Sequence, residues 1–291
     1  NADDGSFGDD RLFNRESSLT LSGDFGKLSF GRMGAIGSAA GDFDAAFAIG
    51  DAFDGGDGDV FGFATSDRYD NMVTYQTPSF SGFQATVQYS LNESSVDNTK
   101  RENSSQVDRY LGLALTAELG ALQGVLAYET QNYASFGDKA QANTEDGQVV
   151  YLGGNYDFEV AKVFVMGQYF KGIKAAQLTA ITEADADRID SAVDPEESAA
   201  AGVKGYGVHL GTIVPVAGGD LTVAAYFTDF TVEFDDGVDG DAKSYAFGAK
   251  YEYYLSKRTS VYTGAGFAQV KYDDDGSDKT TQAYLGLTHR F

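Results

Sequence analysis

The sequence contains no cysteine and only two histidines, His209 and His289, among its 291 residues. Without cysteine there is no disulfide framework, no thiolate zinc site and no cysteine nucleophile. Two imidazoles offer little for metal binding or general base chemistry, and no G-x-S-x-G motif is present. The sequence therefore predicts no catalytic residue, no metal site and no cofactor, and we expect the protein not to be an enzyme.

Basic residues are also scarce, with 21 Lys and Arg against 44 Asp and Glu and a formal net charge of -23. Nucleic-acid binding depends on Lys and Arg that neutralise phosphates, so this balance argues against DNA or RNA as a partner. The 18 Tyr and 21 Phe would be missing from a disordered acidic chain. No apolar run approaches the roughly 18 residues of a helical membrane span, although a membrane β-barrel would not show one.

Proline is almost absent, at 3 residues, whereas glycine is abundant at 36, a combination that favours tight turns between strands. Apolar and polar residues alternate with a period of two, as in residues 83–90 and 283–291, and this period indicates β-strands. Thirteen segments with this alternation are predicted strands: 13–22, 27–33, 69–77, 83–91, 107–118, 122–132, 147–157, 161–171, 203–214, 220–230, 243–254, 258–270 and 280–291.

Short turns and long polar loops alternate as the connections between these segments. A transmembrane barrel has tight turns on its periplasmic side and long loops outside, and each strand needs about ten residues to cross the bilayer. An extracellular β-sandwich also alternates apolar and polar residues, but that fold has no reason to place long loops at every second connection. The pattern favours one all-β domain over residues 1–291, an antiparallel transmembrane β-barrel with thirteen visible strands.

Two stretches of the sequence resemble one known family. Residues 12–32, LFNRESSLTLSGDFGKLSFGR, resemble the FNR...L.G.FG.L..GR hairpin of the trimeric general porins of Gram-negative outer membranes. Residues 68–83, RYDNMVTYQTPSFSGF, resemble the strand that follows the folded-in third loop of that family, and Phe291 matches its terminal aromatic residue. The resemblance implies an outer-membrane homotrimer of sixteen-stranded barrels, each a water-filled channel for passive diffusion of small hydrophilic solutes and ions. It also implies that Phe291 is the assembly signal and that residues 34–68 form a folded-in constriction loop.

An odd number of strands does not close an antiparallel barrel, because the first and last strands would run in the same direction. The chain begins at Asn rather than Met, and residues 1–10 have the composition of an external loop. We therefore expect an odd number of strands before Asn1. Three would complete the sixteen strands of the family, and one would give a barrel of fourteen.

The predicted constriction loop is rich in acidic residues, and basic residues that face it would create a transverse field across the lumen. Arg68 is the best basic candidate, because alternation groups it with Met72 and the resemblance places a constriction arginine here. Arg15 is the second candidate, although alternation pairs it with Leu19 on the lipid side. Acidic residues outnumber these two, which predicts a preference for cations. The acidic candidates are Asp42, Asp44, Asp51, Asp54, Asp57 and Asp59.

The acidic segments raise two questions, calcium binding and contact with lipopolysaccharide. The Asp- and Gly-rich run at residues 54–59 occurs once, whereas calcium-binding repeats need stacked copies, so a solvated or pore-lining segment is favoured. The external loops at 183–190 and 272–276 are acidic, and divalent cations would bridge them to anionic lipopolysaccharide, with a solvated loop as the alternative. Residues 176–192 are rich in alanine and predict a short helix.

Other functions of a membrane barrel fit the sequence less well. A phospholipase would need a Ser and His pair, but His289 lies beside the chain end and His209 has no acidic partner at a motif spacing. A surface adhesin would need a large passenger region, which the sequence does not show. A substrate-specific channel would need a row of aromatic side chains along the lumen, whereas the candidates are scattered over several strands: Tyr110, Tyr226, Tyr262 and Tyr284.

Overall fold

The computed structural model describes residues 15–54, 63–91, 107–134, 145–174, 177–178, 200–234, 240–273 and 276–290. These residues form strands and one short helix. In chain order the elements are β1 (Ser17–Gly23), β2 (Gly26–Gly34), α1 (Ala46–Gly50), β3 (Arg68–Gln76), β4 (Phe83–Ser90), β5 (Arg109–Leu119), β6 (Leu122–Asn132), β7 (Gly147–Asp157), β8 (Lys162–Ile173), β9 (Ala200–Val216), β10 (Gly219–Phe234), β11 (Gly240–Ser256), β12 (Thr259–Tyr272) and β13 (Gly276–His289).

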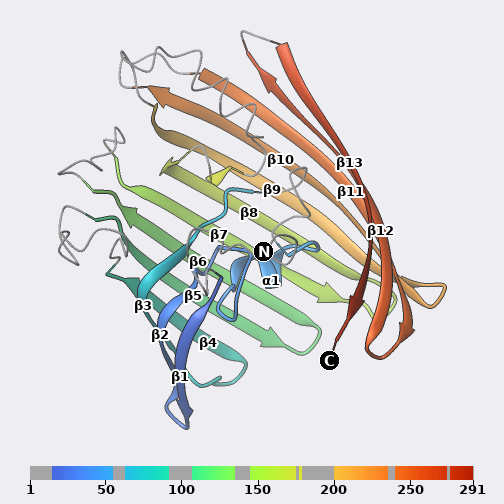
Figure 1. Ribbon diagram of the computed structural model, residues 1–291, viewed down its shortest axis with the longest axis horizontal. Helices are drawn as coiled ribbons and strands as arrows, with labels where there is room; N and C mark the ends of the chain where they lie inside the picture. The colour runs from blue at the N-terminus through green and yellow to red at the C-terminus, as the bar shows by residue number, and fades with distance from the viewer. Residues whose placement is uncertain are drawn as a thin grey trace, which may run out of the picture.

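All of the strands belong to one thirteen-stranded sheet, in which each strand lies beside its neighbours in the chain. Every neighbouring pair is antiparallel. Figure 1 shows the sheet curving around α1, which lies on its concave side. Within the described part of the chain, no helix is long and apolar enough to cross a membrane. The all-β antiparallel fold predicted from the alternation is confirmed.

The alternation of the sequence gives the sheet two chemically different faces. In β7, Leu152 is 65% exposed on the convex face, whereas its neighbour Tyr151 is fully buried on the concave face. In β9, Leu210 is likewise exposed beside the buried His209. A barrel wall in a membrane needs this arrangement, because apolar side chains must face the lipid while polar ones face the lumen.

The ends of the strands follow the predicted segments closely in the middle of the chain. β6 and β7 occupy residues 122–132 and 147–157, as predicted. β9 and β11 are longer, with 17 residues each, because their antiparallel pairing continues beyond the ten or so residues that cross a bilayer. The helix predicted at 176–192 lies outside the described residues except for residues 177–178.

One irregularity interrupts the alternation between β2 and β3. The register shifts within Gly31–Met33, and Asn71 of β3 has a left-handed φ of 48°. The residues before this bulge therefore reverse their orientation, and Tyr69 shares the inner face with Met72. The alternation argument for Arg68 is wrong for this reason, and its assignment to the constriction rests on the family resemblance.

Candidate functional site

The described residues of the segment that connects β2 to β3, residues 35–54 and 63–67, fold onto the concave face of the sheet, and we call these residues the inner loop. Its helix α1 contacts β6, β7 and β8. The ring of Phe47 in α1 is fully buried, with its centroid 5.7 Å from that of Tyr151 and 6.3 Å from that of Phe63. Apolar residues of an otherwise Gly- and Asp-rich segment thus pack the inner loop against the wall.

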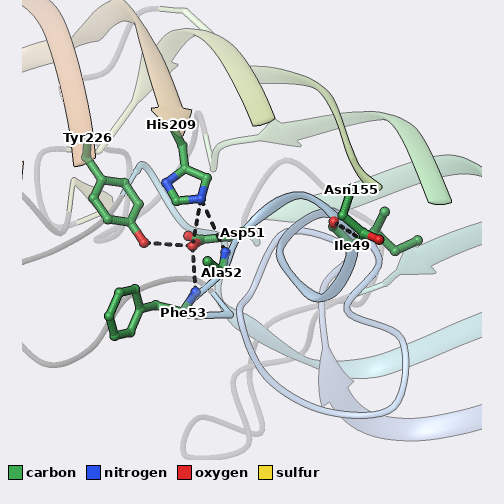
Figure 2. Close-up of polar contacts among 7 residues, drawn as sticks. All are labelled: Ile49, Asp51, Ala52, Phe53, Asn155, His209 and Tyr226. Carbon is green, nitrogen blue, oxygen red and sulfur yellow. Dashed lines mark hydrogen bonds and ion pairs between the residues drawn. The ribbon is translucent and has the colours of Figure 1, made fainter. Parts of the chain in front are cut away.

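Figure 2 shows how the chain after α1 is anchored to the wall. Asp51 is 3% exposed, and its Oδ1 accepts hydrogen bonds from the Tyr226 hydroxyl at 2.6 Å and the Phe53 N–H at 2.9 Å. The Nε2 of His209 lies 3.4 Å from the same oxygen and accepts a hydrogen bond from the Ala52 N–H at 3.2 Å. A ring nitrogen that accepts a hydrogen bond carries no proton, so Nε2 donates none to Asp51. The hydrogen bonds from Tyr226 and Phe53 therefore hold the Asp51 carboxylate.

Side-chain amides of the wall hold two further points of the inner loop. The Asn155 amide of β7 donates a hydrogen bond to the Ile49 carbonyl at 2.8 Å. The Gln168 amide of β8 accepts from the Ala64 N–H at 3.1 Å and donates to the Ala64 carbonyl at 2.6 Å. Ala64 also forms an antiparallel bridge with Leu178. These bonds satisfy backbone groups that would otherwise be buried without partners.

The base of the inner loop is bonded to a buried carboxylate, Glu129 of β6, which is 1% exposed. The inner loop contributes the Gly37 N–H, at 2.9 Å, and the Ser66 hydroxyl. The wall contributes the hydroxyls of Tyr110, at 2.6 Å, and Tyr151, at 2.9 Å. Alternation in β6 indicates that Glu129 faces inward. No motif in the sequence indicates its partners Gly37 and Ser66, which lie 92 and 63 residues away along the chain.

The aspartates predicted to line the constriction have different environments. Asp51 is buried as an anchor of the inner loop. Asp42 and Asp54 are exposed, and Asp44 is half-buried. Asp57 and Asp59 lie outside the described residues. Their predicted role in the constriction stays a prediction.

Asp44 lies just before α1 and its N-cap residue Ala45, and it carries a perturbed carboxyl group. Its Oδ1 accepts a hydrogen bond from the Phe47 N–H at 3.3 Å. Burial, followed by the nearby charge of Asp54, raises the pKa of Asp44 to about 8. Asp44 is therefore mostly protonated at pH 7.

The two predicted basic residues lie in one charged cluster at the start of β1 and β3. The positive charges of Arg15 and Arg32 repel that of Arg68, whereas the carboxylates of Asp67 and Glu16 attract it. The Arg32 guanidinium also donates a hydrogen bond to the Arg68 carbonyl at 3.3 Å. The structure thus brings Arg15 and Arg68 together and adds Arg32 to them.

Lys250 of β11 is a further basic residue beside the inner loop. Its Nζ lies 5.6 Å from the ring centroid of Phe53, the residue that precedes the exposed Asp54. Alternation with Tyr251 places Lys250 on the polar face of its strand, which is the signal that indicates an inward cation. Nothing in the sequence relates β11 to the inner loop.

Both histidines have partners in the structure. His209 contacts Asp51 and Ala52, an arrangement that the sequence spacing does not indicate. The Nδ1 of His289 lies 2.9 Å from the Thr259 hydroxyl at an exposed strand end. In the described ranges, no three His, Asp or Glu side chains are grouped to hold a metal ion.

Two further predictions cannot be located in the structure. Phe291 and the acidic loop at 183–190 lie outside the described residues, as do residues 274–275 of the second acidic loop. The assembly signal and the cation-bridged contact with lipopolysaccharide therefore stay predictions.

Comparison with solved structures identifies the sheet as a porin barrel wall. An anion-selective porin from Comamonas acidovorans superposes with a TM-score of 0.64 at 23% identity, covering 96% of this chain and 78% of the other. OmpT of Vibrio cholerae, in a trimer form, superposes with a TM-score of 0.55 at 15% identity, covering 94% and 79%. These similarities establish the fold.

Sequence comparison establishes the family. The Gram-negative porin family model matches residues 1–275. An outer membrane porin protein of Bordetella pertussis is 30% identical, covering 97% of this chain and 73% of the relative. The predicted outer-membrane location is confirmed, and so is the prediction that the protein is not an enzyme, because porins are channels. The chain belongs to the Gram-negative porin family.

Proposed function

We propose that the protein forms a water-filled channel for passive diffusion of small hydrophilic solutes and ions. The observation that supports this most directly is the attachment of the inner loop to the concave wall. The base of the inner loop is bonded to Glu129 of the wall, and Asp51, which follows α1, is bonded to Tyr226 of the wall. A loop held in this way narrows a lumen at a fixed place. Barrels of about eight strands are filled by side chains, so a wall of thirteen strands leaves room for both the loop and water.

We also propose that the channel prefers cations. Asp42 and Asp54 are exposed on the inner loop, and the whole chain carries a formal net charge of -23. Lys250 beside the inner loop opposes this field, and the similar porin from Comamonas acidovorans is anion-selective. Selectivity depends on the charges at the narrowest part of a channel, which differ among barrels of one fold.

The zero-current potential of reconstituted channels under a KCl gradient tests this preference. We expect a cation-selective sign in dilute salt that fades toward molar salt, because the Debye length is about 10 Å at 0.1 M. Replacing Asp42 and Asp54 together by Asn should reduce the potential. Asp24→Asn, in the exposed turn between β1 and β2, is the matched control and should leave the potential unchanged. An anion-selective sign in the unmodified channel would refute the proposal.

A homotrimer and contact with lipopolysaccharide through divalent cations complete the proposal. The trimer is supported by the family resemblance and by the trimer form of OmpT, a barrel of the same fold. We expect a mass of three chains in mild detergent. Only single chains under those conditions would contradict the trimer.

The tyrosines considered for a substrate-specific channel do not favour that alternative. Tyr110 is buried and donates a hydrogen bond to Glu129. Tyr226 is buried and donates a hydrogen bond to Asp51. Tyr262 and Tyr284 pack on each other, with their ring centroids 6.0 Å apart. Within the described ranges these four residues do not form one row along the lumen, so general diffusion is the better proposal.

A further inference from the structure

We propose that Glu129 closes the base of the inner loop and thereby sets the width of the channel. The inference rests on the proposed function, since it names the residue that positions the constriction. Glu129 would act through the inner loop and not by contact with solutes, because its side chain is buried.

The hydrogen bonds of Glu129 are divided evenly between the inner loop and the wall. Its Oε1 accepts from the Gly37 N–H at 2.9 Å and the Tyr110 hydroxyl at 2.6 Å. Its Oε2 accepts from the Ser66 hydroxyl and from the Tyr151 hydroxyl, the latter at 2.9 Å. Each oxygen therefore joins one limb of the inner loop to one strand beside β6. A carboxylate offers about four acceptor sites, so these four donors use them all.

The two limbs of the inner loop meet at this carboxylate. The Ser66 N–H donates to the Gly37 carbonyl at 2.7 Å, and the Ala35 N–H donates to the Asp67 carbonyl at 3.1 Å. The anchors at Asn155, Gln168 and Asp51 each hold one stretch of the inner loop, as described above. Among the described contacts, Glu129 is the wall residue that bonds both limbs at their base, so it holds the joined limbs against the wall.

The inner loop needs glycine at its contact with Glu129. A Cβ at Gly37 would lie 2.3 Å from the Tyr151 hydroxyl and 2.8 Å from the Glu129 Oε2. On the wall, a Cβ at Gly112, which pairs with Glu129 across β5 and β6, would lie 2.2 Å from the Tyr110 hydroxyl. Both glycines thus make room for the groups around the carboxylate, which indicates that the local sequence is built for this close approach.

Loss of the carboxylate would leave several buried donors without an acceptor. Hydrogen bonds to a charged group are among the strongest in proteins, and a buried backbone N–H such as that of Gly37 cannot change its role. The Ser66 and Tyr151 hydroxyls can rotate and accept a bond instead. Glu129→Gln should therefore have a smaller effect than Glu129→Leu.

Hydrogen exchange of the inner loop and size exclusion of neutral sugars test the proposal together. In the purified full chain, we expect Glu129→Leu to speed amide exchange around Gly37 and Ser66 by roughly ten- to a hundred-fold. In liposomes at high salt, the same variant should admit larger neutral sugars than the unmodified channel. Gly37→Ala should reproduce both effects with the carboxylate intact, and the double variant should add little to either single change.

Glu118→Leu is the matched control, because it removes the same charge from an exposed position near the end of β5. It should leave the exchange and the size limit unchanged. A folded Glu129→Leu protein with unchanged exchange and size limit would overturn the proposal. If that variant does not fold, Glu129→Gln and Gly37→Ala decide by the same two measurements. An unmodified protein that passes no solute would overturn the proposed function, while the exchange measurement would still decide whether Glu129 closes the loop.

Discussion

Two tyrosines on the inner wall lie over glycines of the neighbouring strand. Tyr262 of β12 is paired with Gly286 of β13, and Gly264 is paired with Tyr284. A Cβ at Gly286 would lie 2.2 Å from Cζ of Tyr262, and one at Gly264 would lie 2.2 Å from Cζ of Tyr284. Each ring therefore covers backbone that its glycine leaves bare, as aromatic residues do when they stabilise glycine in a sheet. At the scale of single residues, these tyrosines have a structural role.

Gly286→Ala should destabilise the barrel, because the added methyl group displaces the Tyr262 ring. We expect the free energy of unfolding to fall by about 1–3 kcal/mol, the usual cost of overpacking, as measured by urea unfolding in lipid. Gly124→Ala in β6 is the control, since its Cβ would meet no atom nearer than the Gly153 carbonyl oxygen at 3.9 Å. That variant should be neutral or slightly stabilising. Equal losses in both variants would contradict the role of the rings.

At the scale of the element, the inner loop contains a titratable group that responds near neutral pH. The folded-state pKa of Asp44, about 8, lies above the unfolded value of 3.8. Between these two values the folded state keeps a proton on Asp44 that the unfolded state has released. The contribution of Asp44 to stability is therefore fully present below about pH 4 and is lost as pH rises through 8. Asp44→Asn keeps an uncharged acceptor for the Phe47 N–H and should remove this part of the pH dependence.

Unfolding free energies measured at about pH 5 and about pH 9 check this prediction. The unmodified protein should lose more stability between these values than Asp44→Asn does. Asp24→Asn is the control, since Asp24 is exposed in a turn, and it should follow the unmodified protein. An unchanged pH dependence in Asp44→Asn would show that another group is responsible.

The strands could be predicted from the sequence far better than the contacts of the inner loop. Alternation is a local signal, and it located β6 and β7 to the residue. It failed at Arg68, because the bulge at Asn71 reverses the faces of β3 without any break in the pattern. The partners of Glu129 could not be predicted, since they join residues that only the closed wall brings together. Family resemblance supplied the position of the loop but none of its anchors.

At the scale of the whole molecule, apolar surface and charge are separated. Leu152, Val165 and Leu210 are more than half exposed on neighbouring strands of the convex face. Such a broad apolar face would favour association in water, whereas it matches the lipid interior of the outer membrane. The connection between β7 and β8 is short, which places Val160 at the periplasmic end of the wall in a porin barrel.

An arginine on this face should therefore cost most near the middle of the wall. Leu152 lies at the centre of β7, and Val160, which is also well exposed, lies in the turn beyond it. We expect Leu152→Arg to lower the free energy of unfolding from lipid vesicles by about 2–4 kcal/mol and Val160→Arg by about 0–1 kcal/mol, because the cost of a buried cation falls toward the interface. In detergent micelles, which adapt to the protein surface, the difference should shrink. Equal costs for the two variants in vesicles would mean that β7 does not cross the bilayer with Leu152 near its midplane.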